Sequence, residues 1–425
     1  MFFFSHQSSN EARKVYNNLH FGVSINRGLP CAESILNLNS PKENFLFMLG
    51  HFATDISHGS LPIILAYMYQ AGKLDSYSAV AMLMMANTIL NAVVQPFAGN
   101  LADSKPRPYL MSLGIALSFS GVMFIGLVEN QILLYSLVCL NGLGSAIFHP
   151  AGGKMANTFG KAKLGKSMSI FSVGGNAGMA AGPFYFTGLY ILFGLNATLA
   201  MCVPGLIMII IYTLKNRYYV VACRQEQKKV AKAKADSDEK ENIRGFVILV
   251  CVLFLRSAGW FSFMAFLSLY YMHNLHISDE LATLLNGMVC LCGAIATYFG
   301  GTISDRIGFN KMVTISSLLS VPFIVSFTFT SSPMLATLLL IPFSVLFFTG
   351  MSPTVVIGQK FLCHHVGMAT GFTIGLSMSF GGLIAPLVGK LGDAFGIEYV
   401  MYAVAAFITT AAVTTLVIPK IPVAR

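Results

Sequence analysis

The sequence predicts an all-α membrane protein of twelve transmembrane helices, arranged as two six-helix repeats. Three observations support this prediction: the composition, the recurrence of long apolar segments, and landmarks that repeat at a constant offset. Of the 425 residues, 55% are hydrophobic and only 10% are charged, and the mean hydropathy is +0.69. Such a composition is typical of a protein that crosses a membrane many times.

Twelve mostly apolar segments are long enough to cross a bilayer, because about 20 residues of helix span a hydrocarbon core of about 30 Å. A transmembrane β-strand needs only about half that length, so the segments predict helices rather than a barrel. Glycine and proline occur in many segments, as is common in membrane helices. We predict spans at residues 45–69, 77–98, 108–128, 131–152, 167–190, 194–215, 245–272, 280–300, 311–331, 334–356, 367–389 and 398–418.

The distribution of lysine and arginine predicts the orientation, because cytoplasmic loops retain positive charge. The loops that follow even-numbered spans hold most of the basic residues: Lys105, Arg107, Lys154, Lys161, Lys163, Lys166, Arg306 and Lys311. The opposite loops contain little beyond Lys73 and Lys390. We therefore expect the protein in the cytoplasmic (inner) membrane, with both termini on the cytoplasmic side. The formal charge of +10 then reflects topology and needs no nucleic-acid partner.

The segments outside the spans complete the domain organisation. Residues 215–244 include the charged run KKVAKAKADSDEKEN, which predicts a mobile cytoplasmic linker between halves at 45–214 and 245–418. Residues 1–44 lack the pattern of a cleaved signal peptide and predict a disordered cytoplasmic extension, and residues 419–425 a cytoplasmic tail. The eight cysteines are scattered without metal-site spacing, so no disulfide framework, metal site or cofactor is expected.

Landmarks in the two halves are related by an offset of 202 residues. The second span ends in GNLADSKPR and the eighth in GTISDRIGFNK, which places Asp103 and Asp305 at this offset. Gly165 and Gly367, at the starts of the fifth and eleventh spans, are related in the same way. Six spans return the chain to its starting side, so the repeats are parallel. This layout resembles that of major facilitator transporters, which implies a substrate site between the halves near the bilayer midplane.

The two loops strengthen the resemblance to major facilitators, which commonly have a G-x-L-a-D-r-x-G-r signature after the second span. We expect the glycine to permit a tight turn, and the aspartate to cap a helix and pair with a basic residue at a cytoplasmic gate. One copy would be explained by a helix-capping turn alone, whereas two copies at the repeat offset favour the family. The matching residues are Gly99, Leu101, Asp103 and Arg107 in the first half, and Gly301, Asp305, Arg306 and Gly308 in the second.

Further segments resemble the fosmidomycin-resistance branch of drug exporters over nearly all of residues 45–418. They are HFATD in the first span, QPFAGNLADSKPRPY after the second, GLGSAIFHPAGGKMA with His149 and Pro150, and SIFSVGGNAGMAAGP in the fifth. The last is similar to the Gly-x-x-x-Gly-Pro pattern of proton-driven antiporters, here Gly178, Gly182 and Pro183. The resemblance implies proton-coupled export of a small molecule or drug. Ala151 and Phe184 depart from the pattern of that branch.

Asp55 and Arg256 are the two charged side chains well inside the predicted spans, and they lie at equivalent depths, because position 256 less the offset of 202 is position 54. Ionisable groups at such depth are costly, and by default they indicate function. We expect Asp55 to be the proton-coupling site and Arg256 to bind an anionic, phosphonate-like part of the substrate. The alternative is a permanent Asp55–Arg256 bridge between the halves.

Other polar residues in the spans have two interpretations. His51 lies four residues before Asp55, on the same helix face, and is expected to orient the carboxylate or share its proton; His149 suits a gate, a helix end or a proton relay. Amides and one tryptophan are candidate substrate contacts: Asn87, Asn91, Asn176 and Trp260. Their commoner uses are binding between helices and apolar packing.

The sequence disfavours other functional classes. It contains no zinc-protease motif, nucleophile elbow or phosphate-binding loop, so no enzyme is predicted. A channel would need a filter segment or rings of residues from several subunits. We therefore predict a monomeric secondary transporter of small molecules and protons in the lipid bilayer. Proton symport for uptake of a small organic anion is the alternative, because no residue indicates the direction of transport.

Overall fold

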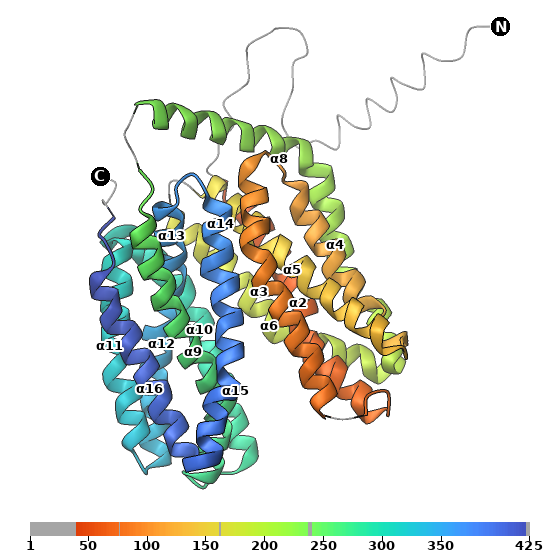
Figure 1. Ribbon diagram of the computed structural model, residues 1–425, viewed down its shortest axis with the longest axis vertical. Coiled ribbons are helices and arrows are strands. Elements are labelled where there is room, and N and C mark those ends of the chain that lie inside the picture. The colour runs from red at the N-terminus through yellow and green to blue at the C-terminus, as the bar shows by residue number, and fades with distance from the viewer. Residues whose placement is uncertain (1–39, 76, 161–162, 237–239, 422–425) are drawn as a thin grey trace, which may run out of the picture. The chain divides into compact units, whose positions relative to one another are not determined.

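The computed structural model describes residues 40–75, 77–160, 163–236 and 240–421, and every regular element within these ranges is a helix (Figure 1). The predicted N-terminal extension, up to residue 39, and the last four residues of the predicted tail lie outside the described residues. The helices of the first half are α2 (Pro41–Gln70), α3 (Tyr77–Ser104), α4 (Tyr109–Met123), α5 (Gln131–Phe159), α6 (Leu164–Phe193), α7 (Ala197–Ala200) and α8 (Cys202–Asp236).

The second half repeats the plan with more interruptions. Its tenth predicted span is divided between α12 and α13, and its eleventh contains a π-helical turn at Gly371–Leu376. The helices of this half are α9 (Ile243–His273), α10 (Asp279–Ile307), α11 (Phe309–Phe329), α12 (Pro333–Thr349), α13 (Met351–Phe361), α14 (Val366–Thr370), α15 (Ser377–Phe395) and α16 (Ile397–Thr414).

Nine helical stretches in the described residues are long and apolar enough to cross a membrane. One of them, Leu164–Lys229, covers two predicted spans, the fifth and the sixth. Helices α2 and α3 are absent from the nine, and both contain buried polar side chains, which lower their hydropathy. The difference from twelve therefore follows from one merged stretch and from two helices with polar faces.

Each half buries its own apolar core. In the first half, Leu61 and Leu65 of α2 pack with Phe186 of α6. In the second half, Phe263 of α9 packs with Phe327 of α11 and Phe343 of α12 in edge-to-face arrangements. The two halves therefore do not depend on one shared core.

The structure differs from the predicted linker at its beginning. Helix α8 continues from the sixth span as far as Asp236 (Figure 1). Tyr219 on this helix is completely buried. The buried carboxylate of Glu43 in α2 explains this packing, because it accepts a hydrogen bond from Tyr219 at 2.6 Å and pairs with Lys215 at 2.5 Å. The first part of residues 215–244 is thus attached to α2 instead of being a solvated connector.

Candidate functional site

Small residues bring α2 and α6 together where the site forms. A Cβ built at Gly174, Gly178 or Gly182 would collide with backbone carbonyls of α2, namely those of Met48, Phe52 and Ile56 respectively. The three glycines are four residues apart and therefore lie on one face of α6. Close backbone approach of this kind is a common way to join membrane helices. The antiporter-like pattern Gly178, Gly182 and Pro183 thus lies at the α2–α6 crossing.

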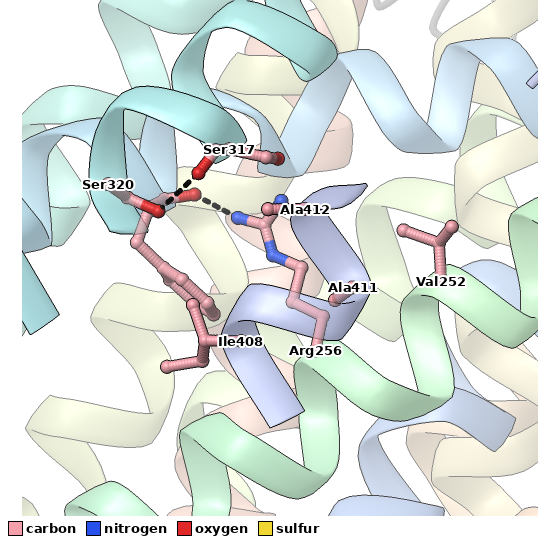
Figure 2. Close-up of a pocket in the computed structure, with 8 residues that line it drawn as sticks. Val252, Arg256, Ser317, Ser320, Ile408, Ala411 and Ala412 are labelled. Atoms are coloured by element: carbon pink, nitrogen blue, oxygen red, sulfur yellow. Dashed lines mark hydrogen bonds between the residues drawn. The ribbon is translucent and has the colours of Figure 1, made fainter. Parts of the chain in front are cut away.

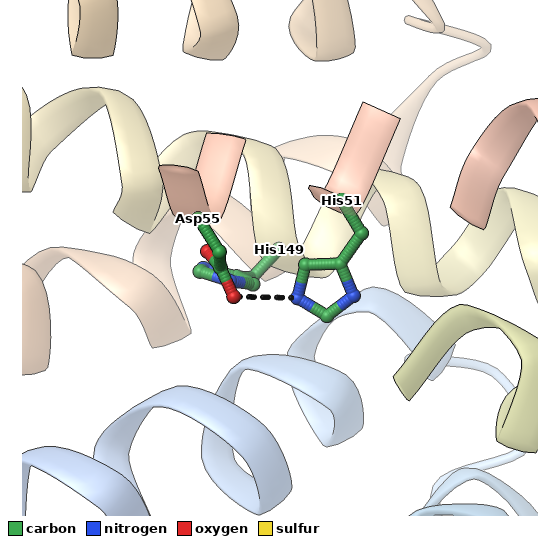
Figure 3. A group of neighbouring side chains, drawn as sticks. All are labelled: His51, Asp55 and His149. Atoms are coloured by element: carbon green, nitrogen blue, oxygen red, sulfur yellow. Dashed lines mark hydrogen bonds and ion pairs between the residues drawn. The ribbon is translucent and has the colours of Figure 1, made fainter. Parts of the chain in front are cut away.

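Asp55 is joined to two histidines in the first half (Figure 3). Its Oδ2 lies 3.3 Å from Nε2 of His51, one turn earlier on α2, and its Oδ1 lies 3.1 Å from Nε2 of His149 on α5. All three residues are buried, with exposed fractions of 4% to 8%. Their donor atoms lie within 4.8 Å of one another, close enough to share protons or a cation. We call these three residues the His–Asp–His cluster.

Each histidine of the cluster is oriented by a backbone carbonyl. Nδ1 of His51 lies 2.7 Å from the carbonyl oxygen of Phe171, and Nδ1 of His149 lies 2.9 Å from that of Ser145. A carbonyl oxygen only accepts hydrogen bonds, so we assign both Nδ1 atoms as donors. Oγ of Ser145, 3.1 Å from Nδ1 of His149, then accepts from the same ring. The His51 ring is also stacked on Phe171, with ring centroids 4.1 Å apart. Both Nε2 atoms are thereby directed at the carboxylate of Asp55.

Gly175 of α6 provides the space for this arrangement. A Cβ built at Gly175 would lie 2.5 Å from Cε1 and Nε2 of His51 and 2.8 Å from Oδ2 of Asp55. Real Cβ atoms do not approach other heavy atoms so closely. Sequence reasoning missed Gly175, although Gly175 lies in the segment SIFSVGGNAGMAAGP that carries the family resemblance.

A chain of hydrogen bonds extends from the cluster to α3. Oγ of Ser145 lies 3.1 Å from Nδ1 of His149 and 3.5 Å from Nδ2 of Asn91, and Gln95 donates to Oδ1 of Asn91 at 2.6 Å. Gln95 lies directly against the backbone of Gly371 in the second half. The side-chain amide of Gln95 fills the space that a Cβ at Gly375 would need, so the hydrogen-bond chain joins the cluster to a contact between the halves.

The remaining candidate residues of the first half have different surroundings. Asn87, fully buried, donates to the carbonyl of Val138 and to the side chain of Asn141 on α5. Asn176 is half-buried on α6, and its Nδ2 has no hydrogen-bond partner in the described part of the chain. Pro150 lies inside α5, which continues to Phe159, so the predicted use of His149–Pro150 as a helix end is wrong.

Arg256 lies inside the second half, on α9 (Figure 2). It is 6% exposed, donates to the carbonyl oxygen of Phe347 on α12, and has its guanidinium 4.1 Å from the centre of the Phe347 ring. Within the described residues, the ion pairs of Asp55 are those with His51 and His149, so a fixed Asp55–Arg256 bridge is not present. Nε of Arg256 has no hydrogen-bond partner among the described residues. Trp260, one turn later, packs against Phe347 and Phe348.

A small cavity of about 10 Å³ adjoins Arg256, which is space for roughly one water molecule. Its lining includes Ser317 and Ser320 of α11 and Ala411 and Ala412 of α16 (Figure 2). A buried guanidinium without a carboxylate partner is costly. The described surroundings of Arg256 supply no carboxylate, so a bound anion would stabilise its guanidinium.

Asp103 and Asp305 each bind the first turn of a helix in the opposite half. Asp103 accepts hydrogen bonds from the amides of Gly367 and Met368, both at 2.9 Å. Asp305 accepts them from the amides of Gly165 and Lys166, at 2.8 and 2.9 Å. Carboxylates stabilise helix N-termini because the terminal amides are unpaired and the helix dipole is positive there.

The signature glycines have a different role from the predicted tight turn. Gly99 lies inside α3 and Gly301 inside α10. A Cβ built at Gly99 would lie 2.6 Å from the carbonyl oxygen of Gly367, and one built at Gly301 would collide with Gly165. The turn prediction was therefore wrong for Gly99 and Gly301, which permit close contact of the two halves. Gly308, the later signature glycine, does form a tight turn: it has a φ of 95° between the end of α10 and the start of α11.

Two further side chains strengthen this end of the molecule. Lys154 of α5 pairs with Asp103 at 3.1 Å, and Asn157 donates to Gln359 of α13 at 2.7 Å. Asn157 and Gln359 are 202 positions apart, so they occupy equivalent places in the two repeats. Arg306 is exposed and Arg107 is half-buried. The basic partner of Asp103 is thus Lys154 of its own half, and not a residue across the gate as expected. Sequence reasoning had assigned Lys154 only to topology.

Comparison with known proteins agrees with this architecture. The profile of the Major Facilitator Superfamily matches residues 47–386 and 249–425. The MFS-type transporter YfnC of Bacillus subtilis is 28% identical over 376 residues, which are 87% of this chain and 91% of YfnC. The fosmidomycin resistance protein of Escherichia coli is 26% identical over 376 residues, with the same two coverages.

A solved structure shares the fold at low sequence identity. The fucose:proton symporter FucP of Escherichia coli aligns with a TM-score of 0.71 over 91% of this chain and 100% of FucP, at 12% identity. A second FucP structure, in the outward conformation, aligns with a TM-score of 0.68. These similarities concern the fold.

Proposed function

The chain belongs to the Major Facilitator Superfamily, a family of membrane transporters and not of enzymes, and we propose that it exports a small molecule in exchange for protons by alternating access. The observation that carries the proposal is the burial of Asp55 between two histidines on α2 and α5. A buried carboxylate with titratable partners can couple proton binding to a conformational change.

The contacts between the halves support a cycle with a closed cytoplasmic gate. Asp103 and Asp305 hold helices of the opposite half at the end that the distribution of basic residues predicts to be cytoplasmic. We propose that the conformation with the closed cytoplasmic gate is open to the outside. On this proposal, proton binding at the His–Asp–His cluster precedes the opening of the cytoplasmic gate. On this proposal the protein is a monomer in the cytoplasmic membrane, with both termini in the cytoplasm.

The similarity to the fosmidomycin resistance protein supports a drug-like cargo with an anionic, phosphonate-like group. We propose that Arg256 binds this group, because it is a buried cation whose Nε has no partner among the described atoms. The cavity beside Arg256 is too small for a phosphonate, so side chains around it must move when the cargo binds. Asn176, with a free amide donor, is a second proposed contact.

The experiment that tests this function is flux into proteoliposomes under an imposed pH gradient. The panel contains fosmidomycin, small carboxylates and cationic drugs. Export in exchange for protons predicts that cargo moves against the proton flow, whereas the alternative, proton symport of an organic anion, predicts movement with it. Flux that ignores the pH gradient for every compound would contradict both.

The substitution Arg256→Lys should weaken anion binding by on the order of tenfold, because lysine retains the charge but loses the two-pronged geometry. Arg256→Ala should abolish it. The measurement is the affinity for fosmidomycin in the parent and both variants, with Arg244→Ala as the control, since Arg244 is an exposed arginine on the same helix. Equal affinity in Arg256→Ala and the parent would make Arg256 structural and the cargo neutral or cationic.

A further inference from the structure

The His–Asp–His cluster has two contacts that cannot be made without protons. Both Nδ1 atoms donate to backbone carbonyls, so a neutral histidine in either position has a bare lone pair on Nε2. These lone pairs would face the oxygens of Asp55 at 3.3 and 3.1 Å. Two acceptors at that distance repel each other, whereas a proton between them makes a hydrogen bond.

We propose that the cluster is a two-proton site, with one proton in the His51–Asp55 contact and a second in the His149–Asp55 contact. This inference rests on the proposed proton coupling and specifies how many protons the site takes. The count does not depend on which atom holds each proton. Two imidazolium rings beside a carboxylate, or one imidazolium beside a carboxylic acid and a neutral ring, both contain two protons and have a net charge of +1.

The environment of the cluster favours this count. Among the described residues, α6 gives the cluster the carbonyl and ring of Phe171 and the space at Gly175, and α5 gives it the backbone carbonyl and hydroxyl of Ser145. His58 on α2 is the other titratable side chain that acts on this region. Loss of both protons would change the cluster from +1 to −1 in a buried place, where unpaired charge is expensive.

The two contacts are also coupled. Both use oxygens of one carboxylate, so a proton bound in one contact changes the charge that the other experiences. The chain through Ser145 and Asn91 reaches Gln95, which lies against Gly371 of the other half. Removal of the protons would release His149 from Asp55, and with it the end of this chain.

The test is magnetic resonance of the full-length protein in lipid bilayers, labelled with ¹⁵N in the histidine rings and ¹³C in the aspartate carboxyls. Signals of the nine histidines are assigned with His51→Gln and His149→Gln. At about pH 7, where a free histidine with a pKa of about 6.5 is mostly neutral, the parent should show a proton in both contacts. His149→Gln should retain one. Asp55→Asn should leave both rings neutral, with the proton on Nδ1.

His273→Gln is the control, because it removes a histidine from the last turn of α9, in the other half of the molecule, and it should leave both protons in place. A neutral ring at His51 or His149 beside an ionised Asp55 in the parent would overturn the proposal. Zinc or another divalent metal bound at one ion per chain would overturn it as well, since the metal would then fill the contacts. The number of protons is measured by magnetic resonance without any transport. Failure of pH-driven flux would therefore contradict the proposed function but would not change the measured number of protons at the cluster.

Discussion

The substitution Gly175→Ala will reduce gradient-driven accumulation by on the order of tenfold or more. The added methyl group would lie 2.5 Å from the His51 ring and 2.8 Å from Oδ2 of Asp55, so the ring must leave its contact with the carboxylate. Overpacking of this kind typically costs about 1–3 kcal/mol, which a twelve-helix protein can tolerate. The protein should therefore fold but couple poorly to the pH gradient.

The matched control for this prediction is Gly188→Ala on the same helix. A Cβ at Gly188 has no atom within 4 Å, so the change should have no effect on accumulation. Accumulation and exchange of labelled for unlabelled cargo are measured on the same proteoliposomes, which separates coupling from folding. Full accumulation in Gly175→Ala would show that the cluster is not required in this geometry.

The double substitution Asp103→Ala with Asp305→Ala will shift the protein towards the inward-open state. Each carboxylate accepts two backbone hydrogen bonds from the opposite half, and a hydrogen bond to a charged group contributes about 1.5–3 kcal/mol. Loss of all four removes several kcal/mol from the closed gate. A shift from 1:99 to 99:1 needs only about 5.5 kcal/mol, so a large change in population is expected.

The shift is measured as the distance between spin labels on cysteines introduced at Lys105 and Arg306, exposed residues at the ends of α3 and α10. The native cysteines are replaced first. Asp393→Ala, which removes an exposed carboxylate from α15, is the control and should leave the distance distribution unchanged. An unchanged distribution in the double variant would mean that the two aspartates only stabilise helix ends.

The repeat made much of the fold predictable. Hydropathy located the helices, and α9 agrees to within two residues, predicted at 245–272 and observed at Ile243–His273. It was less accurate for the sixth span, predicted at 194–215, where α8 runs from Cys202 to Asp236. The offset of 202 identified both Asp103 with Asp305 and Gly165 with Gly367. It did not reveal that the partners cross, so that Asp103 meets Gly367 and Asp305 meets Gly165, because that pairing depends on how the halves pack.

The candidate site was less predictable. The i, i+4 spacing on α2 indicated the contact of His51 with Asp55. The contact of His149 with Asp55 joins two residues that are 94 positions apart in sequence and lie on different helices. Equal depth of Asp55 and Arg256 left a bridge between them open as the alternative, and the structure does not contain it: the arginine side chain turns into its own half and donates to the carbonyl of Phe347. Depth in the membrane can be read from a sequence, whereas the direction of a side chain depends on tertiary packing.

The central claim is that Asp55 couples cargo movement to protons, and the variant Asp55→Asn tests it most directly. Asparagine retains the size of aspartate and one acceptor oxygen, replaces the other oxygen by a donor amide, and removes the titrating carboxyl group. Exchange of labelled for unlabelled cargo across proteoliposomes should therefore survive, because it needs only alternating access, while accumulation driven by a pH gradient should be lost. Accumulation in Asp55→Asn with the pH dependence of the parent would contradict the account and remove Asp55 from the mechanism.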